Sequence, residues 1–377
     1  MPDDALVLLL MLTAGLCLAG NGAVVALLLY ATARRAGRPL LPPVRPVRPG
    51  PSGGIVVGIF VVFVLVTPVV QTLLARCGFF ATLYGPDFPI DLPDKATAAQ
   101  KAASTLRYLW ASAFGFPMTY ALIVGLVRRR TRPAFAPNAA AMNGVAGYLT
   151  WLLVTPAALI VFVLANNVHT WLTGQLPDKH PLTLLGETAG RIEWALFAVQ
   201  AIVFAPVLEE MVFRGVLLSW LMKKESPENR PDEPFALAPS LRGGVVFLVA
   251  FAIAVEDHRK DWFAAVGAGD AKAVAVHTIP AAFVLALVPL YFVLPKLRRL
   301  RRHLRIRSPR HVQGIVASSA LFAAFHSAVW PSPVPLVVLA LAIGYLYART
   351  RSVVGPIVVH GMFNAVSVVY LWLGGPA

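Results

Sequence analysis

Residues 192–221 read IEWALFAVQAIVFAPVLEEMVFRGVLLSWL, a mostly apolar run that carries two adjacent carboxylates, Glu209 and Glu210. A helix needs about 20 apolar residues to cross a lipid bilayer, and this run is longer than that. Ionisable side chains are costly inside a membrane, so those that occur there usually serve a function. The run therefore predicts a transmembrane helix with a functional site on it.

The composition of the whole chain agrees with a membrane protein. Of its 377 residues, 58% are hydrophobic and 14% are charged, and the mean hydropathy is +0.70, whereas soluble domains carry roughly 25% charged residues. A net charge of +15 would suggest nucleic acid as the partner of a soluble protein. Membrane orientation explains it here, and we expect no nucleic acid. The two cysteines form neither a disulfide framework nor a metal-binding pattern.

Ten apolar runs are candidates for membrane spans, and two of them, 243–255 and 335–348, are short for a crossing. The first run follows an acidic start and not the basic start of a secretory signal, so we expect it to be retained. We predict an all-α fold, a polytopic transmembrane helical bundle of about eight to ten spans in a cell membrane. The runs cover residues 5–31, 55–75, 108–127, 142–165, 192–221, 243–255, 274–295, 312–329, 335–348 and 353–373.

Charge in the loops suggests an orientation. If every run crosses, the loops on one side carry 23 Lys and Arg residues and those on the other side carry 9. Because Lys and Arg accumulate in cytoplasmic loops, both termini are predicted to lie outside. Omitting the run 243–255 would put much of the basic segment Lys296–Arg310 on the outer side, so we keep it. We expect this segment to contact anionic lipid headgroups, and the proline-rich stretch Pro39–Pro51 to be an extended linker.

Around the carboxylate pair, helical spacing separates two roles. Pro206 breaks or kinks the helix just before the pair. Glu210 and Arg214 are four residues apart and share one helix face, so we expect them to form a structural ion pair. Glu209 is rotated by about 100° from Glu210 and is the carboxylate we expect to accept a proton.

Two later spans carry further polar side chains. His326 lies in the run 312–329, and His360 and Asn364 are four apart in the last run, on one helix face. Alone, each could be a structural hydrogen-bonding residue in a membrane helix. Together with the carboxylates, they provide a general base, an acid or second base, and oxyanion donors. This is the minimum set for hydrolysing an amide with water.

In these motifs the sequence resembles the CPBP intramembrane proteases, which comprise type II CAAX prenyl endopeptidases and bacterial Abi or bacteriocin-processing relatives. The resemblance covers about residues 192–373. It rests on three motifs in the family's order, EExxxR at Glu209, Glu210 and Arg214, FxxxH at Phe322 and His326, and HxxxN at His360 and Asn364.

The resemblance implies a mechanism and a class of substrate. Glu209 with His326 would activate a water molecule for attack on a peptide carbonyl, and His360 with Asn364 would stabilise the oxyanion. The partner would be a membrane-associated peptide or protein, with or without a prenyl group.

The spacing of the motifs departs from the family. Its EE and FxxxH helices are usually close in sequence, whereas Glu209 and His326 are 117 residues apart here. We expect an inserted helical hairpin at about 223–311, which returns the chain to the same side of the membrane. Residues 191–377 would then form the catalytic membrane domain, and residues 1–190 an N-terminal membrane region of about four spans with no assigned role.

Several alternatives stay open. Two histidines and a glutamate could also bind zinc, but the sequence has no HExxH motif, so we favour a metal-free glutamate mechanism with no cofactor. A catalytically silent scaffold or bacteriocin-immunity protein would share the fold, and a transporter could use the same groups to relay protons. Histidines outside the motifs, His258, His277 and His311 among them, are expected at solvated positions in or beside loops.

Overall fold

The computed structural model describes residues 50–89, 97–128, 137–174, 189–223, 237, 239–306 and 308–373, together with some residues between 20 and 36. All the regular elements in these ranges are helices, so the predicted all-α fold is confirmed. The proline-rich stretch and the first apolar run lie almost entirely outside the described residues.

Seven of the described helices are long and apolar enough to cross a membrane, which supports a polytopic bundle and a multi-pass membrane protein. They fall where the sequence predicts spans, and the short run 335–348 is among them. Their bounds are Gly53–Arg76, Ala99–Leu126, Ala140–Thr173, Arg191–Met222, Ala271–Lys296, Pro333–Thr350 and Val354–Trp372.

Two predicted runs form helices that are not among these seven. The run 243–255 lies in α10 (Pro239–Gly267), where Arg242 and Glu256 bound a short apolar centre. The first 13 residues of the run 312–329 lie in α13 (Pro309–Ala324), which has only 16 residues, and residues 325–329 form a turn after it. The predicted orientation of the termini stays a prediction.

The described helices fall into two compact units, and each combines segments from both halves of the chain. The carboxylate unit, as we call the one that contains the carboxylate pair, comprises nearly all of α2 (Gly53–Arg76), then α3 (Phe79–Tyr84), α4 (Ala98–Arg128), α7 (Arg191–Val199), the following helical turns to Val212, and α15 (Val354–Leu373) from His360 onward. The predicted division of the chain into residues 1–190 and 191–377 assigns a role to each part, and it stays a prediction.

Apolar and polar contacts hold α4 against the carboxylate helix in the carboxylate unit. Leu106 and Leu109 of α4 form a buried cluster with Phe197 of α7 and with Val368 of α15. At its edge, the buried Gln200 donates to the Leu109 carbonyl at 2.9 Å and accepts from the Ser112 hydroxyl of α4. Because buried polar groups are costly unless paired, these bonds fix the register of α4 on the carboxylate helix.

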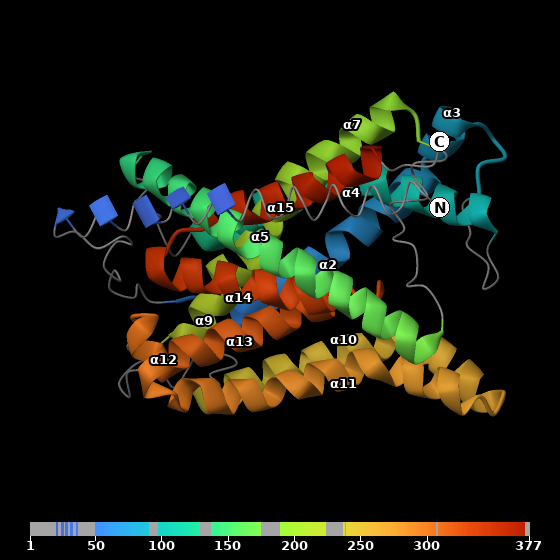
Figure 1. Ribbon diagram of the computed structural model, residues 1–377. Helices are drawn as coiled ribbons and strands as arrows, with labels where there is room; N and C mark the ends of the chain where they lie inside the picture. The colour runs from blue at the N-terminus through green and yellow to red at the C-terminus, as the bar shows by residue number, and fades with distance from the viewer. Residues whose placement is uncertain are drawn as a thin grey trace. The chain divides into compact units, whose positions relative to one another are not determined.

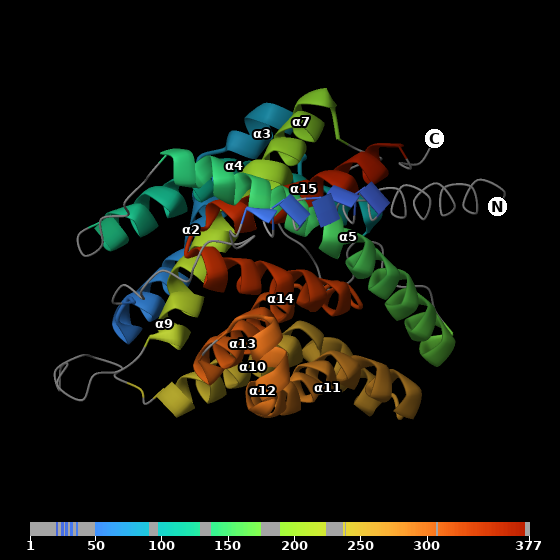
Figure 2. The ribbon, with the colours of Figure 1, turned by 60° about the vertical axis from the view of Figure 1, so that its left-hand side comes forward.

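The second unit, called the α13 unit here, contains α5 (Pro137–Thr173) from Asn138 and the chain from Phe213 to Val359. Its centre is α13, of which nearly every residue from Val312 onward is buried. Figures 1 and 2 show α14 (Pro333–Thr350) on one side of α13, and α10 and α11 (Ala271–Val293) on the other. Buried among other helices, α13 positions the segment that carries His326.

Candidate functional site

The carboxylate pair lies on a long helix that is interrupted by two π-helical stretches. After α7 come the π-helix η1 (Gln200–Phe204), α8 (Ala205–Glu210), the π-helix η2 (Met211–Leu218) and α9 (Ser219–Met222). Glu209 and Glu210 are the last residues of α8, between the two π-helical stretches. Because π-helical turns are rare and often occur at functional sites, this irregularity draws attention to the same two residues that the sequence does.

Pro206 removes one backbone N–H from the hydrogen-bond pattern that begins in η1. The Ala205 N–H bonds to the Gln200 carbonyl, five residues back. In that register the Ala201 carbonyl would pair with residue 206, and a proline nitrogen carries no hydrogen. The side-chain amide of Asn364 donates to this carbonyl at 2.8 Å instead. The proline of the first motif and the asparagine of the third are therefore complementary.

A glycine allows α15 to come this close to η1. A Cβ atom on Gly361 would lie 2.6 Å from the backbone carbonyl oxygen of Ile202, well inside ordinary contact. Any larger residue at this position would push the two helices apart. Gly361 lies between His360 and Asn364, so the close approach sets the position of both motif side chains.

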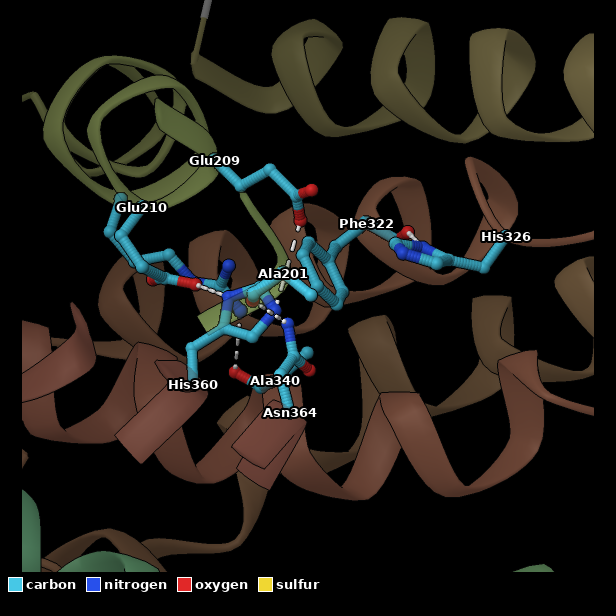
Figure 3. A network of polar contacts seen from close by, with 9 residues as sticks. Ala201, Glu209, Glu210, Phe322, His326, Ala340, His360 and Asn364 are labelled. Carbon is cyan, nitrogen blue, oxygen red and sulfur yellow. Dashed lines mark hydrogen bonds and ion pairs between the residues drawn. The ribbon is translucent and has the colours of Figure 1, made fainter. Parts of the chain in front are cut away.

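His360 lies between the two carboxylates, as Figure 3 shows. Its Nδ1 is 2.9 Å from Glu210 Oε1 and its Nε2 is 3.9 Å from Glu209 Oε2. Glu210 is fully buried and His360 nearly so, while the Glu209 side chain is 20% exposed. The buried carboxylate therefore orients the imidazole ring, and the more exposed one can meet a substrate or water.

Four of the six predicted site residues, Glu209, Glu210, His360 and Asn364, thus lie close together in the carboxylate unit. The predicted ion pair between Glu210 and Arg214 stays a prediction. The observed partner of Glu210 is a histidine 150 residues away, which helical spacing alone could not indicate.

Arg214 and Phe322 link the first and second motifs within the α13 unit. The guanidinium of Arg214 lies over the Phe322 ring, 4.6 Å from its centroid, and the side chain is fully buried. It also donates to the Ala340 carbonyl of α14 at 3.4 Å. A guanidinium stacks well on an aromatic face, which gives the phenylalanine of FxxxH a structural reason to be there.

His326 follows the end of α13, and its ring orientation is set by its own motif. Its Nδ1 lies 2.9 Å from the Phe322 carbonyl, a contact that Figure 3 also shows. A carbonyl can only accept, so Nδ1 carries the hydrogen. In a neutral imidazole the lone pair is then on Nε2, and this nitrogen can accept a proton.

Helix α10 contributes two residues, Asp257 and His258, that the sequence did not single out. The Ser327 hydroxyl lies 2.6 Å from Asp257 Oδ2, and His258 Nε2–H donates to the Ser327 carbonyl at 2.9 Å. The expectation that His258 and His277 lie in or beside loops is wrong, because they belong to α10 and α11. The one signal for Asp257 and His258 in the sequence is their place at the end of the apolar run 243–255, next to the acidic Glu256.

His311 is also less solvated than expected. It lies in α13, half-buried, with its Nε2 3.4 Å from a guanidinium nitrogen of Arg351. Burial, together with the nearby positive charge of Arg351, lowers the pKa of His311 from 6.5 to about 4. It is therefore neutral at physiological pH.

The zinc alternative needs several side chains of the right kind within reach of one ion. Within the part of the chain that the structure describes, no three His, Cys, Asp or Glu side chains are grouped so that they could hold a metal ion. Zinc in catalytic sites has three protein ligands. We therefore derive no step of the chemistry through a metal.

Residues 191–366 match a protein-family model described as Type II CAAX prenyl endopeptidase Rce1-like. This segment is a domain of that family. The match begins at α7, spans α10 and α11 and ends just after Asn364, so it contains all three motifs named above. Comparison with curated proteins and with solved structures gave no significant match. The family's activity implies a peptidase that acts in a membrane.

Proposed function

We propose that the protein is an intramembrane endopeptidase that hydrolyses a peptide bond with a water molecule activated by Glu209 and His326. The observation that carries this proposal is the position of His360, whose two ring nitrogens face the two adjacent carboxylates at 2.9 and 3.9 Å. A buried carboxylate that orients a histidine toward a second, more exposed acid is a typical arrangement for general acid and base catalysis.

In the proposed first step, water attacks the carbonyl carbon of the substrate and gives its proton to Glu209. The carbonyl π electrons move onto oxygen and form the oxyanion. His326 assists through Nε2, because its Nδ1 hydrogen is engaged by the Phe322 carbonyl. Since one carboxylate of the pair is fully buried against His360, the partly exposed Glu209 is the better base.

His360 and Asn364 are proposed to stabilise the oxyanion. When protonated, His360 donates from Nδ1 to Glu210 and presents Nε2–H to the reaction. The Asn364 amide nitrogen has two hydrogens, of which one bonds to the Ala201 carbonyl. A single oxyanion donor contributes about 3 to 4 kcal/mol to the transition state. The intermediate then collapses, the C–N bond breaks, and Glu209 returns the proton to the leaving amine.

The substrate is proposed to be a lipidated or membrane-embedded peptide. Its test is cleavage of matched prenylated and unprenylated peptides ending in CAAX by the purified protein in liposomes. Glu209→Gln and His326→Asn, each checked for an unchanged melting temperature, should reduce cleavage by at least 100-fold, on the order expected for removing a general base. Undiminished cleavage by both folded variants would contradict the proposal. Dependence on the prenyl group would narrow the substrate to CAAX proteins.

The metal-free version of this mechanism has its own test. Cleavage should persist after treatment with 1,10-phenanthroline. Loss of activity that zinc restores would instead favour the zinc alternative, and it would reassign the histidines as ligands.

We also propose that the basic segment Lys296–Arg310 binds an anionic lipid headgroup. A cavity of about 650 Å³ at this segment is lined by Arg298, Arg301, Arg302, Arg305 and Ile306. The chain has no Asp or Glu after Asp270, so the charged side chains of this segment and of the helices that follow it are all basic. Guanidinium groups bind phosphate oxygens with two parallel hydrogen bonds, which fits a phospholipid headgroup.

The backbone around this cavity is fixed by the neighbouring helix α14. The Arg349 side chain donates to the Arg305 carbonyl at 2.9 Å, and the Tyr345 hydroxyl donates to the Leu304 carbonyl at 3.0 Å. Arg305 itself adopts a left-handed conformation, with φ of 52°. A fixed loop holds the arginines at a defined site, in contrast to a mobile tail of like charges.

Two triple variants that remove equal charge distinguish this site from general attraction to the membrane. Arg298→Gln/Arg301→Gln/Arg302→Gln changes the cavity lining, and the control replaces the exposed Lys296, Arg299 and Arg310 with Gln. Native mass spectrometry with phosphatidylglycerol should show a loss of bound lipid in the first variant only. An equal loss of bound lipid in both variants would contradict a defined site. Displacement of the lipid by inorganic phosphate would show that the site recognises phosphate alone and not the whole lipid.

A further inference from the structure

The predicted inserted hairpin, formed by α10 and α11, belongs to the α13 unit, and its two helices pack closely together. The Phe247 ring of α10 packs edge-on against Tyr291 of α11, with centroids 5.6 Å apart. A Cβ atom on Gly243 would collide with the Tyr291 ring, so the two helices touch closely there. Near the other end of the hairpin, Trp262 donates to the Thr278 hydroxyl at 3.2 Å.

The hairpin packs directly against the helix that carries the second motif. Both α10 and α11 contact α13, and Figure 1 shows them running alongside it. At its start, α10 is tied to α9 by Arg242, which donates to the Trp220 carbonyl at 3.0 Å. The hairpin is therefore held at both α9 and α13.

Two consecutive residues of α10 hold the residue that follows His326. His258 bonds to the backbone carbonyl of Ser327, and Asp257 to its hydroxyl. The same hydroxyl lies 2.6 Å from the Ala324 carbonyl, so it shares its one hydrogen between the end of α13 and the hairpin. Ser327 is 2% exposed, and these contacts account for its buried polar groups.

His326 is thus fixed from both sides. On its N-terminal side the ring bonds to the Phe322 carbonyl of its own helix. On its C-terminal side α13 has ended, and the next residue, Ser327, is held by α10. Groups that orient a reactive side chain from outside the site matter because a misplacement of about 1 Å can cost 100-fold in rate.

We propose that Asp257 and His258 of the inserted hairpin are positioning residues, which set His326 by holding Ser327. They act through Ser327 and do not touch the substrate. The kinetic part of this inference rests on the proposed peptidase function, and the structural part does not.

Paired substitutions test the kinetic part. Asp257→Ala and His258→Leu remove the contacts, whereas Asp257→Asn keeps an acceptor oxygen and His258→Gln keeps an N–H donor near the position of Nε2. We expect the first two to lower kcat on the reporter peptide by on the order of 10- to 100-fold with KM changed less than twofold. The conservative pair should keep most of the activity. Asp261→Ala, at an exposed position of α10, is the matched control and should keep full kcat.

A second measurement does not need activity. In protein carrying ¹³C,¹⁵N-labelled histidine, the ring resonances of His326, assigned with His326→Asn, should shift in Asp257→Ala, in His258→Leu and in Ser327→Ala but not in Asp261→Ala. An unchanged His326 resonance in these three variants would overturn the inference, even if the wild type cleaves peptides. Conversely, a wild type that cleaves no peptide would contradict the proposed function, while the resonances would still decide the role of the hairpin.

Discussion

Replacing Gly361 with alanine should separate α15 from η1, the two helical segments that meet beside His360 in the carboxylate unit. The added Cβ would lie 2.6 Å from the Ile202 carbonyl oxygen, whereas ordinary contact begins at 3.4 Å. The helices must therefore move apart by the difference, about 0.8 Å. Neither atom belongs to a flexible side chain, so a change of rotamer cannot absorb this movement.

The displacement acts on both neighbours of Gly361 in the third motif. His360 would move relative to the two carboxylates, and Asn364 would move away from the Ala201 carbonyl, which is 2.8 Å distant. Because a misplacement of about 1 Å can cost 100-fold in rate, we expect kcat to fall by on the order of 10- to 100-fold. Overpacking of this kind also costs about 1 to 3 kcal/mol of stability.

The liposome cleavage assay and a thermal unfolding curve measure both effects. Gly125→Ala is the control, because a Cβ on Gly125 of α4 meets no atom within 4 Å. It should leave kcat unchanged and stabilise the helix by up to about 1 kcal/mol. Wild-type activity together with an unchanged melting temperature in Gly361→Ala would refute the close approach of α15 to η1.

Three further predictions follow from individual contacts. Asn364→Leu should lower the free energy of unfolding by about 1 to 3 kcal/mol, because it leaves the Ala201 carbonyl without its side-chain donor. Pro206→Ala restores a backbone N–H, so Asn364→Leu should cost less stability in a chain that also carries Pro206→Ala. A double-mutant cycle of unfolding free energies measures this difference. Arg214→Lys should lower the melting temperature, because an ammonium cannot reproduce the stacking of a guanidinium, and Arg214→Met should lower it further. The pKa of His311 is about 4 in the folded protein and 6.5 in the unfolded chain. Between these pH values the unfolded chain therefore binds more protons, and stability should fall as the pH falls from 6.5 to 4. Melting curves of His311→Gln across this range should lack that part of the decline.

Hydropathy was enough to predict the helices, because a span is a local property of about 20 consecutive residues. Each of the nine apolar runs after the first overlaps a helix, although the helix under the run 312–329 ends at Ala324. Four side chains of the motifs lie close together in the carboxylate unit. Helical spacing, however, proposes partners only within one helix, such as Glu210 and Arg214. That Glu210 meets His360 depends on how distant helices pack, and no local pattern records that.

The hairpin illustrates the same limit. Its length and its place between two motifs were visible in the sequence, and so was the need for two helices. The contacts of Asp257 and His258 with Ser327 were not visible, because they join residues about 70 positions apart. Each residue taken alone resembles an ordinary polar group at the end of an apolar run.

Three positions that seem independent in the sequence have one physical origin. Pro206 removes a backbone donor, and this leaves the Ala201 carbonyl without a partner in the π-helical register. Asn364 supplies the missing donor, and Gly361 permits the approach that brings it within 2.8 Å. The register change before Glu209 and the amide four residues after His360 therefore depend on each other. A chain that kept the carboxylates but lost the proline would no longer need the asparagine for its fold, and any remaining requirement for it would come from catalysis alone.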